Sequence, residues 1–269
     1  MPSRSWMVAL AALVWATAPL QARRVIDSPH EFVYEALIGA GGSIEIKGVN
    51  GNVTAEESDG EEVEVVARKR GDSGSADEVR VTLIEHDGGA TICALYPAAD
   101  QDRPDHCGAG EDGPPAAVPG GVQVDFVVRV PRGVRFVGRT ANGRVAAKAV
   151  SAGVEAHTLN GSIDLELSSG PAKASSVNGS IKATVMPGLR HQLEMATVNG
   201  DITLDVGPAS PRLWAETVNG EIEARVPLGM PEEISPTRLV ARLGGGADED
   251  APEIKLRTVN GDIRLERRP

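Results

Sequence analysis

A six-residue motif centred on Asn-Gly recurs seven times in this chain and constrains its fold more than any other feature. Successive motif asparagines are 92, 18, 18, 21, 20 and 41 residues apart, so five copies follow one another at about 20 residues. A period of this length is typical of solenoids, in which each repeat needs a neighbour to bury its apolar side. The copies are GVNGNV (48–53), TANGRV (140–145), TLNGSI (158–163), SVNGSI (176–181), TVNGDI (197–202), TVNGEI (217–222) and TVNGDI (258–263).

The residues around each motif alternate between apolar and polar with a period of two, as in a strand with one buried face. After the fifth motif, for example, Ile202, Leu204 and Val206 alternate with Thr203 and Asp205. A similar alternating stretch precedes the motif. Each repeat is therefore expected to consist of a strand, an Asn-Gly corner, a second strand and a Gly/Pro turn, which predicts an all-β fold with a thin aliphatic interior.

The repeats could be arranged in two ways. Asn-Gly is a strong hairpin signal, so an antiparallel meander is one alternative. We favour a parallel β-solenoid, because stacked coils bring the same position of every repeat to a common edge. Asparagines stacked at that edge can hydrogen-bond from repeat to repeat, which favours a structural role for them over a catalytic one. The corner residues are Asn50, Asn142, Asn160, Asn178, Asn199, Asn219 and Asn260, followed by Gly51, Gly143, Gly161, Gly179, Gly200, Gly220 and Gly261.

The last interval between motifs is close to two periods. It predicts one further repeat without Asn-Gly near Arg238–Leu243. The chain then ends on a strand in which Arg264, Arg267 and Arg268 would charge the final edge and discourage edge-to-edge aggregation.

The region between the first and second motifs has a different pattern. Four segments of strand length, EVEVVAR (62–68), VRVTLIEH (79–86), ATICALY (90–96) and VQVDFVVRV (122–130), are separated by turn-forming residues. We interpret them as longer strands that cap the open end of the coil. The stretches 98–121 and 244–251 are expected to be loops. The prediction is one β-solenoid domain, with an N-terminal repeat and wider capping strands over 23–137 and regular Asn-Gly repeats over 138–269.

The N-terminus has the features of an export signal. Residues 1–22 contain Arg4, no acidic residue, an apolar run from Met7 to Leu20 and a small residue, Ala22. A cleaved signal peptide over 1–22 is the favoured interpretation, and an uncleaved anchor is the alternative. Because no later stretch is long and apolar enough to cross a bilayer, the mature chain is expected to have no transmembrane segment and to be periplasmic or secreted.

Cys93 and Cys107 are the only cysteines. In an exported protein they predict a disulfide that closes a Pro- and Asp-rich excursion. The alternative is a zinc site that adds His86 and His106, but the paired spacing of such sites is absent. We therefore predict no metal and no cofactor.

Composition and motifs exclude several functions. The chain has 27 basic and 38 acidic residues, a net charge of −11 and few aromatic residues, which argues against nucleic-acid binding. No catalytic or nucleotide-binding motif is present. The acidic residues that follow Asn-Gly, Asp201, Glu221 and Asp262, could hold a cation on neighbouring repeats, although a solvated charged face is the favoured interpretation.

Trp214 is the one tryptophan outside the predicted signal segment. It falls at an outward position between Leu213 and Ala215. It could stack on a sugar or anchor a protein partner. Partial burial beneath a loop is the favoured alternative.

These motifs resemble a family of exported bacterial proteins with adhesin-like repeat domains, whose biochemical role is unknown. The resemblance covers nearly all of the mature chain and rests on VNGNV, the stretch VVRVPRGVRFVGRTANGRV and the serial TVNGDI units. It implies a right-handed β-solenoid in a cell-envelope protein and offers no catalytic residues to transfer.

Together these features predict a monomeric, non-enzymatic envelope protein that presents a repetitive acidic β surface to an envelope protein or glycan. Two alternatives stay open, a polysaccharide-active β-helix enzyme and an envelope signalling module that binds a protein.

Overall fold

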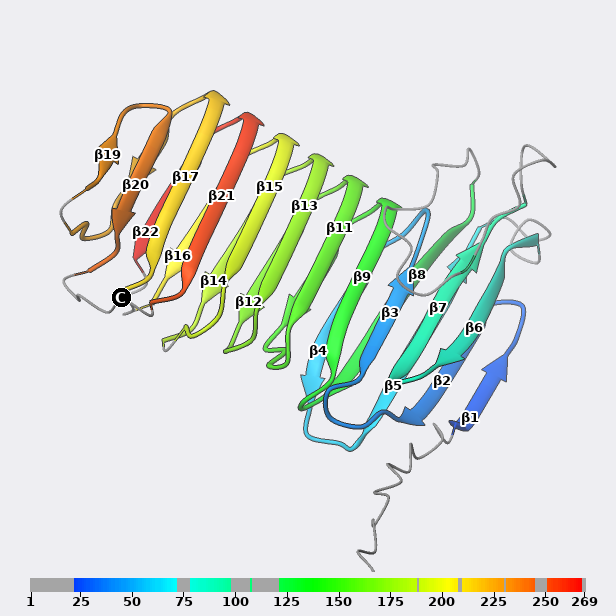
Figure 1. Cartoon of the computed structure of the whole chain (residues 1–269). Helices are drawn as coiled ribbons and strands as arrows, with labels where there is room; N and C mark the ends of the chain where they lie inside the picture. The colour runs from blue at the N-terminus through cyan, green and yellow to red at the C-terminus, as the bar shows by residue number, and fades with distance from the viewer. Residues whose placement is uncertain are drawn as a thin grey trace, which may run out of the picture.

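The chain forms two large β-sheets that face each other as layers (Figure 1). The computed structural model describes residues 22–71, 78–97, 107, 121–187, 189–207, 210–229, 231–244 and 251–267. Every named element within these ranges is a strand, and each sheet has eleven of them. The all-β prediction is confirmed.

The first sheet mixes antiparallel and parallel neighbours. In spatial order its strands are β1 (Ala22–Asp27), β2 (Glu31–Leu37), β5 (Glu62–Arg70), β8 (Gln123–Pro131), β4 (Val53–Ser58), β10 (Val145–Lys148), β12 (Ile163–Leu167), β14 (Ile181–Val185), β16 (Ile202–Val206), β22 (Ile263–Arg267) and β18 (Ile222–Ala224).

The second sheet covers the other side of the core. In spatial order its strands are β19 (Glu233–Ile234), β20 (Arg238–Arg242), β17 (Arg212–Asn219), β21 (Glu253–Asn260), β15 (Leu193–Asn199), β13 (Ala172–Asn178), β11 (Val154–Asn160), β9 (Arg135–Asn142), β3 (Ser43–Lys47), β7 (Gly89–Leu95) and β6 (Arg80–His86).

Each Asn-Gly repeat contributes one strand to each sheet, with the motif at the corner between them. β11 in the second sheet leads through the corner at Asn160 to β12 in the first. Neighbouring repeats pair in parallel and in register, so Asn160 lies opposite Asn178, and Ile163 lies opposite Ile181. The repeats therefore do not form an antiparallel meander of hairpins.

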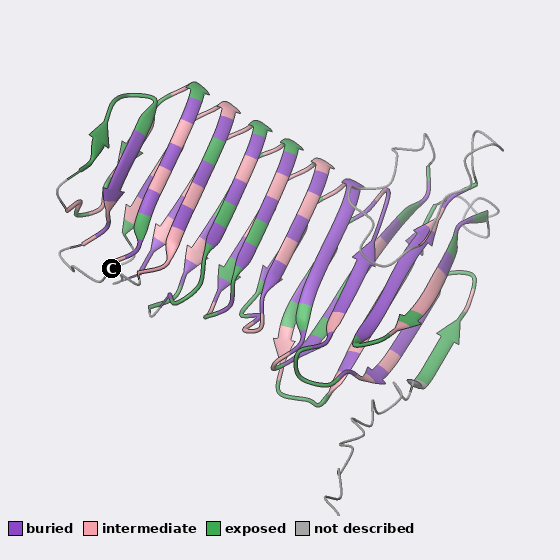
Figure 2. Ribbon diagram, in the orientation of Figure 1, coloured by how far each residue is buried: buried purple, intermediate pink, exposed green. Residues whose placement is uncertain are grey.

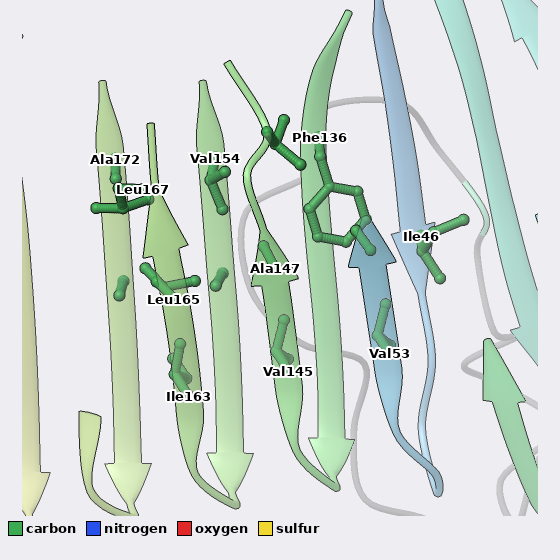
Figure 3. Close-up of a cluster of buried hydrophobic side chains, with 14 of the residues drawn as sticks. Ile46, Val53, Phe136, Val145, Ala147, Val154, Ile163, Leu165, Leu167 and Ala172 are labelled. Carbon is green, nitrogen blue, oxygen red and sulfur yellow. The ribbon is translucent and has the colours of Figure 1, made fainter. Parts of the chain in front are cut away.

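Aliphatic side chains from the inner faces of both sheets fill the space between them. Figure 3 shows Ile163, Leu165 and Leu167 along β12, next to Val145 and Ala147 of the neighbouring β10. All five are at most 3% exposed. Because every repeat places the same kind of side chain at the same height, each layer of the core continues into the next repeat.

The backbones of neighbouring repeats come very close together at the corner. A Cβ atom built on Gly179 would overlap the carbonyl oxygen of Gly161 in the preceding repeat. Only glycine fits at this position, since the overlapping atom belongs to backbone that cannot turn aside.

The N-terminal part is built from longer strands. β5 and β8 pair antiparallel to each other, and β2 pairs antiparallel to β5. Larger side chains, Tyr34, Phe126 and Phe136, are fully buried there. The four segments expected to be strands in this region correspond to β5, β6, β7 and β8, with ends that differ by at most two residues.

The C-terminal strand order differs from the prediction. β21 lies between β15 and β17 and is parallel to both, and β22 lies between β16 and β18 (Figure 1). The predicted extra repeat near Arg238–Leu243 is wrong, because β20 runs antiparallel to β17. The predicted edge role of Arg264 and Arg267 is also wrong, since β22 has a neighbour on each side. The extra repeat was predicted from the length of the last interval, which assumes that repeats stack in chain order. Here the last repeat instead lies between the two repeats that precede it in the chain.

Several predictions fall outside the described residues. These are the signal peptide apart from Ala22, most of the loops over 98–121 and 244–251, and Arg268. In the part of the chain that the structure describes, no helix is long and apolar enough to cross a membrane.

Candidate functional site

The seven motif asparagines form one continuous row of hydrogen bonds, here called the corner ladder. Asn50 accepts the first bond, and from Asn142 onward each Nδ2 donates to the Oδ1 of the asparagine before it in the stack over 2.7–2.9 Å. In stacking order the ladder runs Asn50, Asn142, Asn160, Asn178, Asn199, Asn260 and Asn219. Every one of the seven side-chain amides therefore takes part in at least one bond of this row.

In every repeat except the first, which has Gly48, the residue two positions before the asparagine adds a second bond. The Thr158 hydroxyl donates to the Gly143 carbonyl oxygen over 3.0 Å, and the Thr197 hydroxyl donates to that of Gly179 over 2.8 Å. These Thr or Ser side chains point inward, where an unsatisfied hydroxyl would be costly. The bond to the preceding corner explains why Thr or Ser recurs at this position.

The N-terminal end of the corner ladder is closed by a buried tyrosine. The Tyr96 hydroxyl lies 3.2 Å from the Asn50 carbonyl oxygen and 3.1 Å from the Val122 carbonyl oxygen. Burial raises the pKa of Tyr96 to about 12, so its hydroxyl remains a neutral donor.

The acidic residues after Asn-Gly come together as the sequence suggested. In stacking order they are Asp201, Asp262 and Glu221, and the backbone amide of Asp262 donates to Asp201 Oδ1 over 2.9 Å. The Arg264 guanidinium donates to Asp201 over 2.9 Å and to Asp262 over 2.8 Å. A cation is thus already supplied by the chain. The Asp262 amide, followed by Arg264, lowers the pKa of Asp201.

Trp214 lies on the outer face of the second sheet, half-buried between two arginines. The Arg257 guanidinium is 5.1 Å from the ring centroid, and that of Arg238 is 5.9 Å from it. The two arginines belong to β21 and β20, which flank β17 on opposite sides. Because cations hold the ring from both neighbouring strands, Trp214 ties three strands together by cation–π contacts. This placement disfavours sugar stacking on an open ring face.

In the last five repeats of the stack, the residue directly before the motif asparagine forms a partly exposed aliphatic row that the sequence analysis did not identify. Val177, Val198 and Val218 are 37%, 40% and 62% exposed, and Leu159 is partly buried against the core. This set, here called the valine row, is in stacking order Leu159, Val177, Val198, Val259 and Val218. The signal was present as the residue directly before Asn in these five copies, although Val49 and Ala141 at the same position of the first two copies are fully buried.

A charged cluster is buried on the outer face of the second sheet near its other end. Glu45, Lys47 and Arg139 are each only 6% exposed, although their positions alternate with core residues. Glu45 accepts hydrogen bonds from Arg139 Nε over 3.1 Å and from the Thr91 hydroxyl over 3.2 Å. In Figure 2, β9, β3 and β7 are buried along most of their length, whereas β11 to β17 alternate.

The cysteine pair lies beside this cluster. Cys93 and Cys107 are at disulfide distance, with their Cα atoms 5.8 Å apart. Cys93 on β7 is the register partner of Lys47 on β3. The cross-link therefore holds Cys107 against the same outer face that carries the charged cluster. His86 is near Thr91, and among the described residues no group of three or more His, Cys, Asp or Glu side chains could hold a metal ion.

Comparisons with known proteins give distant structural neighbours. A "putative cell adhesion protein" of Clostridium sporogenes is 7% identical, with a TM-score of 0.49 over 88% of this chain and 99% of that one. A "putative adhesin" of Bacteroides fragilis is 10% identical, with a TM-score of 0.32 over 88% and 98% of the two chains. A "putative lipid binding protein" of Parabacteroides distasonis is 12% identical, with a TM-score of 0.23 over 88% and 96%.

No family model and no curated protein matches the chain. The function is therefore argued from the residues of this chain.

Proposed function

We propose that the protein is an exported, non-enzymatic, adhesin-like module that binds a protein of the cell envelope through the valine row. In this proposal the chain is a single right-handed parallel β-solenoid. Residues 1–22 are its signal peptide, and the mature protein is a periplasmic or secreted monomer. The Asn-Gly corners serve as structural residues that keep the binding row in line.

The observation that carries the proposal is the contiguous exposed row itself. Isolated apolar residues are common on protein surfaces, but contiguous exposed apolar patches mark interaction sites. Five register neighbours at a strand spacing of about 4.8 Å make a row about 20 Å long. The four valines are not part of the buried core, whereas Leu159 at the end of the row is partly buried against it. A strand needs a β-branched residue at this position only as a weak preference, so recurrence without burial favours contact with a partner.

The chemistry of the row favours a protein over a glycan. Sugar rings are bound by open aromatic faces together with polar groups, and the ring of Trp214 is flanked by Arg238 and Arg257. Aliphatic side chains instead suit the apolar centre of a protein interface. Because the row repeats one chemical group, several weak contacts can act together on an extended partner.

The proposal is tested by replacing Val177, Val198 and Val218 with threonine. Threonine keeps the β-branched shape but makes the row polar. The matched control is Val127→Thr, because Val127 is also exposed, at 46%, but lies on β8 in the first sheet. We expect photo-crosslinking in intact cells to give a defined protein adduct with the wild type and the control. The triple variant should give at least tenfold less of this adduct, and its melting temperature should be unchanged.

A second arm measures co-sedimentation with purified cell-wall glycan. An adduct that is undiminished in the triple variant contradicts the proposal. Glycan binding by the wild type that survives the triple substitution would favour the polysaccharide alternative.

A further inference from the structure

The last repeat of the chain occupies a position that two earlier repeats leave open. Here Glu253–Arg267 is called the C-terminal unit, and the space between β15–β16 and β17–β18 is called the slot. β21 pairs in parallel with both strands beside it in the second sheet, and β22 does so in the first. Without the C-terminal unit, both sheets would be interrupted at the same level.

The slot recognises the C-terminal unit by its backbone and its motif. Residues 258–263 read TVNGDI, which is identical to residues 197–202 on one wall of the slot. Asn260 donates to Asn199 over 2.8 Å and accepts from Asn219 over 2.8 Å. The Thr258 hydroxyl donates to the Gly200 carbonyl oxygen over 2.8 Å. The corner ladder is thus continuous only when the slot is filled.

Charge complements this fit. The C-terminal unit has four basic and three acidic side chains, whereas the wall over 193–206 has three acidic and no basic ones. The wall over 212–224 has three acidic side chains and one basic. Arg257 pairs with Glu216 over 3.3 Å, and Arg264 pairs with Asp201 over 2.9 Å.

Register neighbours across the second sheet follow the same pattern. Lys255 lies opposite Glu194. Like charges also meet, since Asp205 lies opposite Glu266 in the first sheet and Asp262 stacks between Asp201 and Glu221 at the corner. A basic unit therefore sits between two acidic walls, an arrangement that selects against an acidic repeat at this position.

The connection to the C-terminal unit is longer than its path requires. Arg212 at the start of β17 is the register partner of both Arg242 on β20 and Glu253 on β21. The chain therefore has to cross one strand, about 10 Å between the two flanking strands. Ten peptide steps beyond Leu243 lead to Glu253, and they can span about 33 Å when extended. The C-terminal unit can thus reach beyond its own slot while β20 stays in place.

We propose that the slot is a binding site for a basic Thr-Val-Asn-Gly-Asp-Ile unit, and that a second copy of this chain fills it by reciprocal exchange of C-terminal units. Exchange of an identical element is a low-cost route to a dimer, because the contacts in each slot are unchanged. In dilute solution the chain fills its own slot, since the connection gives an effective concentration in the millimolar range. Exchange prevails where copies are crowded or where insertion within one chain is disfavoured. This inference does not depend on the valine row.

The test reverses the charges of one partner at a time in the full-length mature protein. The slot variant carries Glu194→Lys and Glu216→Lys, and the unit variant carries Lys255→Glu and Arg257→Glu. Each variant alone places like charges together when its own unit inserts. When the two are mixed, exchange restores opposite charges in both slots. The control combines all four substitutions in one chain, which restores opposite charges without exchange.

We expect size-exclusion chromatography with light scattering and native mass spectrometry to show a one-to-one heterodimer in the mixture. Its amount should exceed the homodimer of either variant at least tenfold, while the wild type and the four-substitution control stay monomeric at the same concentration. If either variant fails to fold alone, the two are refolded together from denaturant, and the heterodimer is still expected. A mixture that yields no heterodimer, by mixing or by joint refolding, overturns the proposal.

Discussion

The repeats from β10 to β16 and the strands from β1 to β9 enclose the same core in different ways. Across the repeats, neighbours are 18–21 residues apart in the chain, all parallel and in register. In the N-terminal part, β2, β5 and β8 are antiparallel neighbours drawn from distant segments. The outer face of the second sheet differs as well, since it alternates over the repeats but is buried over β3, β7 and β9 (Figure 2).

This difference shows what each arrangement depends on. Identical hydrogen bonds, repeated at every corner, hold the repeats, and so no single side chain is decisive there. The N-terminal part instead relies on a few unique contacts, namely the charged cluster around Glu45, the Cys93–Cys107 pair and large side chains such as Phe126. Substitutions should therefore act unequally in the two regions.

The largest difference is expected between two ion pairs. Glu45→Ala removes the carboxylate that pairs with the buried Arg139 and Lys47. Breaking a buried ion pair in this way lowers the free energy of unfolding by about 3–5 kcal/mol. Asp164→Ala removes the pair with Arg144, whose side chain is 56% exposed, and should cost less than about 1 kcal/mol. Urea denaturation measures both free energies of unfolding. Equal losses would mean that the buried cluster is not what distinguishes the two regions.

Reduction of the disulfide should affect the N-terminal part selectively. The bridge closes a separation of 14 residues, for which a loop-entropy model gives about 3 kcal/mol. Amide hydrogen exchange of the reduced protein should increase over β3, β7 and β9, whereas protection of β13 to β16 and the fluorescence of Trp214 stay unchanged. Free thiols in the protein isolated from its native source, or uniform loss of protection, would contradict this expectation.

One substitution in the corner ladder should cost a moderate amount. Asn199→Ala removes the bond donated to Asn178 and the bond accepted from Asn260, and we expect a loss of about 1 kcal/mol. Lys182→Ala, on the exposed face of β14, serves as the control and should stay within about 0.5 kcal/mol. If Asn199→Ala loses no more stability than the control, the corner ladder does not contribute measurably to the stability of the repeats.

The smallest effect should come from Asp201→Asn. The pKa of Asp201 is lowered in the folded protein by the Asp262 amide and Arg264, so its ionised form stabilises the fold above the unfolded value of about 3.9. This contribution is lost as the pH falls through the folded pKa. The variant should be less stable than the wild type by under about 1 kcal/mol at pH 7, and the gap should narrow below pH 4. Thermal melts at both values test this, and a gap that widens on acidification contradicts it.

Much of the fold could be predicted because the same sequence pattern recurs in every repeat. The Asn-Gly period and the alternation around it predict strands, parallel neighbours and a shared edge of asparagines. The four capping strands could be located because their alternation is long and bounded by turn residues. The sequence also placed Asp201, Glu221 and Asp262 on neighbouring repeats. It could not show that Arg264 would bridge two of them, since that contact joins strands whose proximity depends on stacking order.

The features that were missed are those that depend on long-range placement. The burial of Glu45 and Lys47 is one of them, because alternation predicts only which side of a strand a residue faces and not what covers that side. Trp214 read as an isolated outward residue, because the two arginines beside it come from β20 and β21. The valine row was overlooked since β-branched residues are expected in any strand.

The sequence by itself determined the local chemistry of this protein, namely which residues form strands, which turn the corners and which face inward. Periodicity encodes these properties within each repeat. Only the tertiary structure decided the order of the last repeats, the burial of the charged cluster and the two arginines around Trp214. Identical motifs fit any gap in the stack equally well, so the choice among gaps depends on the length of the connecting segments and on the charges of neighbouring strands.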